Sequence, residues 1–102
     1  MKTYSTVADI PARNARDLAA YAEKHGWKWV AAEGQDSDSN SFVTVIAGNP
    51  ADGEQYKVTW HTRETGTFRL FSKLHQRAFG TAWLDAPSLT VIRRRISSCA
   101  QL

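Results

Sequence analysis

The sequence predicts an α+β fold in which a four-stranded antiparallel sheet, connected as a meander, lies between an N-terminal and a C-terminal helix. Three observations predict it. Apolar and polar residues alternate along residues 56–73 with the period of two that half-buried strands show. Start and stop signals bracket a helix over residues 11–25, and a second start signal lies at residues 85–88. The 102 residues are enough for one hydrophobic core, so we expect a single domain over residues 1–102.

The first helix carries signals at both ends. Asp9 or Ile10 is expected to cap it, Pro11 suits its first turn, and Gly26 is placed to end it. Its apolar stripe consists mostly of small residues, namely Ala15, Leu18, Ala19 and Ala22. Such a stripe would let the helix pack closely on the buried face of the sheet.

Two strands are expected between this helix and the hairpin, over residues 27–33 and 42–47, and residues 3–7 can add an edge strand. Trp27 and Trp29 point to the same side of the first strand. We interpret the two indoles as core packing, and an exposed platform on which bases stack is the alternative. The strand over residues 42–47 is apolar on both sides, which is typical of a central strand that is at least partly covered on both faces.

The hairpin over residues 56–73 decides which side chains share a face. A three-residue loop of Glu64, Thr65 and Gly66 places glycine at the left-handed position of a type I turn with a bulge. The resulting register pairs Trp60 with Leu70, Thr62 with Phe68, His61 with Arg69, Thr59 with Phe71 and Lys57 with Lys73. A four-residue loop would mix the two faces, because a slip of one residue inverts a strand.

The two faces of this hairpin are therefore unlike. One face is expected to bury Tyr56, Val58, Trp60, Phe68 and Leu70. The other presents Lys57, His61, Arg69 and Lys73 around Phe71. Because Lys57 and Lys73 would repel each other, this face indicates either screening by solvent or an anionic partner.

The C-terminal part begins with residues 78–84, which can form another short strand. Residues 85–88 then give a helix-start signature, in which Pro87 lies in the first turn. Apolar residues follow at helical spacing, namely Leu89, Ile92, Ile96 and Cys99. This spacing favours a helix whose outer side carries Arg93, Arg94 and Arg95, and a strand over residues 89–96 is the competing interpretation.

Composition narrows the class of protein. The net charge of +3 and the isoelectric point near 9.3 make an acidic partner reasonable. One cysteine cannot form an internal disulfide or a thiolate cluster for zinc, and we expect no metal or other cofactor. The first residues, MKTYSTVADIPARN, lack the apolar run of a signal peptide, and no other run is long enough to span a membrane. We therefore expect a cytoplasmic protein without a membrane partner.

Catalytic motifs are not recognisable in the sequence. The three histidines show no metal-ligand spacing, and there is no glycine-rich phosphate loop and no GxSxG motif. A small nuclease built from Lys57, His61 and Glu64 can be imagined, but a lone histidine on a sheet face is usually only solvated. We therefore expect a protein that binds and does not catalyse.

Two binding hypotheses remain. In the first, one sheet face and the C-terminal arginine cluster contact nucleic acid. Cations from Lys57, His61, Arg69 and Lys73 would reach phosphates, Phe71 would stack on a base, and Arg93, Arg94 and Arg95 would extend the footprint. In the second, Trp27, Trp83 or arginine anchors contact a partner protein. A solvated helix face also explains the arginine run.

The composition and two short segments of the sequence show a resemblance to a class of small proteins. The sequence has fourteen alanines and eight arginines against five lysines, and it contains segments such as WHTRETGTF and DAPSLTVIRRRIS. In these respects the chain resembles small orphan proteins of phages that infect GC-rich, actinobacterial-type hosts. The resemblance implies an accessory role, such as binding and modulating a host protein or handling nucleic acid, and it assigns no functional residue.

Overall fold

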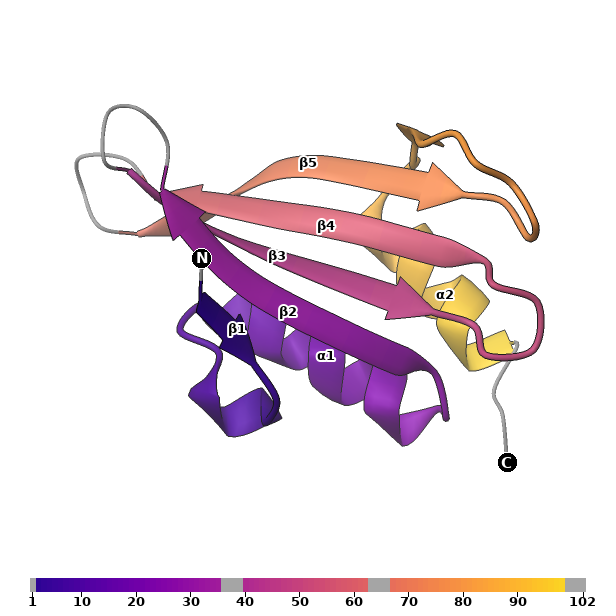
Figure 1. Ribbon diagram of the computed structural model, residues 1–102, viewed down its shortest axis with the longest axis horizontal. Coiled ribbons are helices and arrows are strands. Elements are labelled where there is room, and N and C mark those ends of the chain that lie inside the picture. The colour runs from indigo at the N-terminus through magenta and orange to yellow at the C-terminus, as the bar shows by residue number, and fades with distance from the viewer. Residues whose placement is uncertain (1, 36–39, 63–66, 99–102) are drawn as a thin grey trace.

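The computed structural model describes residues 2–35, 40–62 and 67–98, and it has two layers: a twisted sheet and two helices on one of its faces (Figure 1). The sheet has six strands in the order β1-β2-β3-β4-β5-β6, and each neighbouring pair is antiparallel. The strands are β1 (Lys2–Tyr4), β2 (Lys28–Gln35), β3 (Ser41–Gly48), β4 (Gln55–Thr62), β5 (Phe68–Gln76) and β6 (Leu84–Asp85). The helical segments are η1 (Val7–Asp9), one turn of 3₁₀ helix, followed by α1 (Arg13–Lys24) and α2 (Leu89–Ser98). The α+β class and the C-terminal helix are confirmed, but the prediction of four strands is wrong.

The two additional strands are very short and lie at the edges of the sheet. β1 pairs with the middle of β2, and the expected edge strand over residues 3–7 is cut short because Val7 begins η1. β6 pairs with only two residues of β5. Most of the expected strand over residues 78–84 is absent, because a turn closes from the Gly80 amide to the Arg77 carbonyl at 2.9 Å.

The first helix ends as predicted but begins differently. Gly26 follows it with a positive φ of 77°, a left-handed conformation that glycine adopts without a steric cost. The expected cap at Asp9 or Ile10 is wrong, because Ala12 occupies the cap position and makes no side-chain hydrogen bond there. Instead, Arg16 holds the turn before the helix by donating from Nη1 to the Ile10 carbonyl at 2.8 Å.

The helix prediction for the C-terminal segment is confirmed, and the competing strand is wrong. Ser88 caps α2, because its Oγ accepts a hydrogen bond from the Val91 amide at 3.1 Å. Pro87 therefore precedes the helix, and its predicted place in the first turn is wrong. Ile92 and Ile96 are fully buried beneath the sheet. Cys99, which was expected to continue this apolar stripe, lies outside the described residues.

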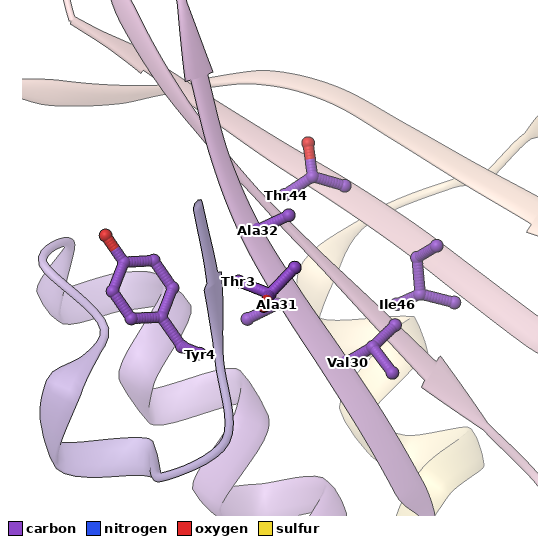
Figure 2. A pocket seen from close by; sticks show the side chains of 7 residues that line it. All are labelled: Thr3, Tyr4, Val30, Ala31, Ala32, Thr44 and Ile46. Carbon is purple, nitrogen blue, oxygen red and sulfur yellow. The ribbon is translucent and has the colours of Figure 1, made fainter. Parts of the chain in front are cut away.

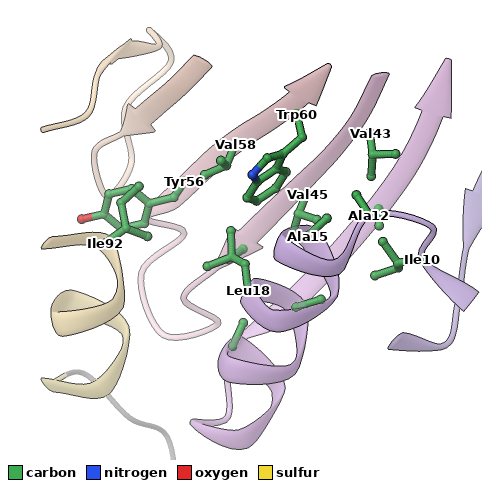
Figure 3. Packing of buried hydrophobic residues seen from close by; sticks show 14 of the residues in the cluster. Ile10, Ala12, Ala15, Leu18, Val43, Val45, Tyr56, Val58, Trp60 and Ile92 are labelled. Carbon is green, nitrogen blue, oxygen red and sulfur yellow. The ribbon is translucent and has the colours of Figure 1, made fainter. Parts of the chain in front are cut away.

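The hydrophobic core lies between the helices and one face of the sheet (Figure 3). The predicted stripe of α1 is fully buried and meets inward-pointing side chains of the central strands. Among the largest fully buried side chains are Ile10, Leu18, Val43, Val45, Val58, Trp60 and Ile92. The core interpretation of Trp27 is confirmed, since only 3% of this residue is exposed. Leu70 was expected in the core, but it is 43% exposed.

The register of the β4–β5 hairpin is partly as predicted. Trp60 pairs with Leu70, His61 with Arg69 and Thr62 with Phe68. Beyond these pairs a β-bulge adds one residue to β5, so that Thr59 pairs with Ser72, and Lys57 with Leu74. The predicted pairs of Thr59 with Phe71 and of Lys57 with Lys73 are therefore wrong. The three-residue loop predicted at Glu64, Thr65 and Gly66 lies outside the described residues.

The β1 strand is attached to β2 by a side-chain hydrogen bond that predicts a pH dependence. The Tyr4 hydroxyl donates to Glu33 across the strand pair. This bond, together with burial and the negative charge of Glu33, raises the pKa of Tyr4 from 10.0 to about 12. An unfolded chain would ionise this phenol near the lower value, so the bond stabilises the fold below pH 10 and its contribution is lost as the pH rises to about 12.

Alkaline titration of the phenolate absorbance tests this prediction. We expect Tyr4→Phe to lose the amplitude of one phenol near pH 12, where the folded wild type ionises Tyr4. The urea midpoints of the two proteins should also converge as the pH is raised from 10 towards 12. Identical titration curves near pH 12 would show that Tyr4 does not make this bond in solution.

Candidate functional site

The face of the sheet opposite the helices carries most of the residues expected to bind, and we call it the outer face. The alternation of each strand defines it, and its side chains include Lys28, Val30, Phe42, Thr44, Ile46, Lys57, Thr59, His61, Arg69 and Phe71. In the part of the chain that the structure describes, no helix covers this face (Figure 1). Val30 is 60% exposed and Phe71 is 65% exposed. The outer face is thus a broad open surface, although the outward-facing side chains of β3, Phe42, Thr44 and Ile46, are half-buried, in agreement with the expectation that this strand is at least partly covered on both sides.

Four of the predicted site residues converge on the outer face. His61 pairs with Arg69 across β4 and β5, and its ring lies 5.5 Å from that of Phe71 between centroids. Lys57 lies on the same face of β4, with its Nζ 4.7 Å from the centroid of the Trp83 ring. The structure therefore places aromatic rings and positive charges side by side.

Lys73 does not join this group. Since the bulge shifts the register of β5, Lys73 pairs with Val58, whose side chain points into the core between sheet and helices. Lys73 is consequently half-buried on the helix side of the sheet. Its predicted position beside Lys57 is wrong, and so is the predicted repulsion between the two cations.

The three arginines of α2 do not extend the outer face. The helix packs on the opposite side of the sheet, where Ile92 and Ile96 enter the core. Arg95 donates from Nε to Glu54 Oε1 at 2.9 Å, and the Arg93 guanidinium lies 5.4 Å from the centroid of the Tyr21 ring. Arg94 is exposed on that side. A single ligand on the outer face would therefore not meet the arginine run directly.

A hollow of about 290 Å³ lies at the centre of the outer face, between β3, β4 and β5, and we call it the Phe42–Phe71 hollow. Its lining consists of Phe42, Thr44, Thr59, His61, Phe71 and Ser72. The Thr44 and Thr59 hydroxyls form a hydrogen bond of 2.9 Å across β3 and β4. The hollow thus presents a mostly apolar surface next to aromatic rings, and these two hydroxyls are bonded to each other.

Gly34 explains how this hollow forms. It pairs with Phe42, and a Cβ atom at Gly34 would lie only 2.6 Å from Phe42 Cζ. The Phe42 ring therefore rests on the bare backbone of β2, and we infer that this leaves the space above Thr44 and Thr59 open. Gly34, Phe42 and Thr44 were not among the residues predicted to bind, although a glycine inside a strand is a signal of close approach by another group.

A second, more apolar hollow of about 230 Å³ adjoins the first across Thr44 (Figure 2). Val30 and Ile46 stand beside each other in it, and Tyr4 lies at its edge on β1. It carries no charged side chain in its lining. A ligand on this part of the outer face would therefore contact only uncharged residues of the lining.

Within residues 2–35, 40–62 and 67–98, no group of three His, Cys, Asp or Glu side chains is arranged to hold a metal ion. Lys57 and His61 of the imagined nuclease share the outer face, whereas Glu64 lies outside the described residues.

Among the residues that the structure describes, neither helix is long and apolar enough to span a bilayer.

Charge on the outer face is modest and positive. Lys28, Lys57 and Arg69 contribute cations, and Asp85 of β6 lies in the same row of paired residues as Lys57.

Comparison of the chain with protein-family models, with curated proteins and with solved structures finds no match.

Proposed function

We propose that this protein binds single-stranded nucleic acid on the outer face. The observation that carries the proposal is the exposed ring of Phe71 beside His61, on an open sheet face that also bears Arg69 and Lys57. Base–aromatic stacking contributes about 1–3 kcal/mol per base, and it tolerates any sequence because every base has a π-face. This geometry supports the first of the two binding hypotheses with four of its eight residues.

A single strand fits this surface better than a duplex. Phe71 can stack only on a base that is not already stacked between its neighbours, and an open sheet presents its rings to bases that are splayed out. Arg69 and Lys57 lie on strands β5 and β4 on either side of the bulge, where they can reach phosphates that follow the bound bases. Handling of nucleic acid is also one of the accessory roles that the resemblance to small phage proteins implies.

Charge reversal on the outer face tests the proposal. We expect Lys57→Glu combined with Arg69→Glu to weaken the binding of a single-stranded oligonucleotide strongly at low salt. If each cation neutralises one phosphate, the slope of log Kobs against log salt should fall by about 1.4 when both are lost. Affinity is measured by fluorescence anisotropy over a series of salt concentrations, with circular dichroism to verify the fold.

A matched control separates local contacts from net charge. Arg13→Glu combined with Arg94→Glu makes the same change in net charge, but both residues are exposed on helices behind the sheet. This variant should retain most of the affinity. Equal losses in the two variants would rule out the outer face as the binding surface.

A partner protein is the alternative outcome of the same experiment. Its predicted anchor Trp27 is buried, so an aromatic-anchored contact would use other side chains, such as the predicted Trp83 or the exposed Phe79. Such a contact changes little with salt, whereas nucleic-acid affinity falls steeply. If the wild-type protein does not bind a single-stranded oligonucleotide at low salt, this result would therefore contradict the proposed function.

A further inference from the structure

The Phe42–Phe71 hollow differs from a flat stacking platform, because it is a concave site lined by residues of three strands. Phe42 and Phe71 come from β3 and β5, His61 contacts Phe71 from β4, and the hydrogen-bonded pair of Thr44 and Thr59 contributes hydroxyl groups. Its volume of about 290 Å³ is near the lower end of the range for small-molecule pockets, about 300–1,000 Å³. A single flat ring is the kind of group that matches this size and this mostly apolar lining.

We propose that the hollow holds one unstacked nucleobase of the bound strand. This inference rests on the proposed function and adds the group that is recognised. The base would lie against the Phe71 ring, and because the lining that it meets is mostly apolar, stacking rather than hydrogen bonds to the base edge would hold it. Arg69 pairs with His61 at the rim, where a cation can contact the phosphate of the inserted nucleotide.

Charge favours a nucleotide over a peptide side chain as the occupant. The hollow's own lining contains no carboxylate or lysine, so it would take a neutral group. The charges nearest to it along the paired strands are cations, Arg69 beside His61 and Lys57 two residues before Thr59. A neutral ring attached to an anionic backbone is complementary to both features, and a nucleotide has this combination.

Gly34 provides a way to close the hollow without replacing any of the residues that line it. A methyl group at this position would lie within 2.6 Å of Phe42 Cζ, so Gly34→Ala must displace the Phe42 ring from β2. We expect the displaced ring to occupy the space above Thr44 and Thr59. Gly48→Ala is the matched control, because its Cβ atom would find its nearest neighbour, Gln55 Cγ, at 3.6 Å, an ordinary contact.

The experiment compares an oligothymidylate with an abasic oligonucleotide of the same length and charge. With wild type and Gly48→Ala, we expect the oligothymidylate to bind at least about tenfold more tightly than the abasic strand, as expected for one stacked base. Gly34→Ala should lose most of this ratio while it retains the salt-dependent affinity for both strands. Phe71→Leu, which keeps an apolar side chain but removes the ring, should lose the ratio as well, and it decides the matter if Gly34→Ala does not fold.

The outcomes distinguish this inference from the proposed function. Equal affinity of wild type for the two strands, with binding still weakened on reversal of Lys57 and Arg69, would overturn the base pocket and leave the nucleic-acid surface standing. Equal loss of the ratio in Gly34→Ala and Gly48→Ala would also overturn the pocket. If wild type binds neither strand at low salt, the proposed function fails and the pocket fails with it.

Discussion

Replacement of Trp60 by alanine is expected to lower the free energy of unfolding by about 3–5 kcal/mol. Only 1% of Trp60 is exposed, and its indole extends from β4 towards Leu18 of α1 (Figure 3). Its removal would leave a cavity between the sheet and the helix, which rigid strands cannot fill. Since a small domain is stable by only about 5–15 kcal/mol in total, urea unfolding followed by circular dichroism should show a large shift of the midpoint.

Phe71→Ala is the matched control for this prediction. Phe71 is an aromatic residue of the same hairpin, but it lies on the outer face and is 65% exposed. Its truncation should change stability by no more than about 0.5 kcal/mol, as is usual for surface substitutions. Comparable losses in the two variants would mean that the hairpin does not separate a buried face from an exposed one.

This difference between faces is the part of the fold that the sequence predicts best. The alternation in β4 correctly places Val58 and Trp60 in the core and Lys57 and His61 on the other side. It does so because one buried face imposes a period of two on every residue of a strand. The same logic identifies the apolar stripe of α1, where burial imposes a period of 3.6.

Register errors begin where the local sequence carries no signal. Nothing in FRLFSK marks the bulge, since no glycine or proline interrupts it, yet one extra residue moves Lys73 to the core side. Each of the short edge strands, β1 and β6, offers too few residues for a periodic pattern. Their pairing follows from the tertiary structure, in which β2 and β5 leave edges available.

The arginine run was misplaced for a similar reason. Spacing alone correctly assigned Ile92 and Ile96 to the buried side of α2, but it could not show against which face of the sheet the helix packs. Arg95 meets Glu54, a residue 41 positions earlier in the chain. A contact of this kind depends on the completed fold, whereas the positions of His61, Arg69 and Phe71 depend mainly on one hairpin.

Glu54→Ala is expected to cost about 1–3 kcal/mol, because it removes the carboxylate that joins α2 to the sheet. Glu54 is buried, and its two oxygens accept from Arg95 Nε at 2.9 Å and contact His75 Nε2 at 3.2 Å. The backbone around it is also fixed, since the Glu54 amide donates to Asp52 Oδ1 at 2.9 Å. Because His75 and Arg95 are themselves partly exposed, they can regain water, so the cost stays below that of stranding a fully buried charge.

Adjacent arginines on α2 provide the control for this ion pair. Arg95→Ala should reproduce part of the loss seen in Glu54→Ala, whereas Arg94→Ala, which truncates an exposed side chain one position earlier, should change stability by no more than about 0.5 kcal/mol. Urea unfolding gives the stabilities, and amide hydrogen exchange should show faster exchange within α2 for Glu54→Ala and Arg95→Ala than for Arg94→Ala. Equal exchange in all three variants would contradict a role of Glu54 in holding α2, and the position of the arginine run behind the sheet would then rest on the burial of Ile92 and Ile96 alone.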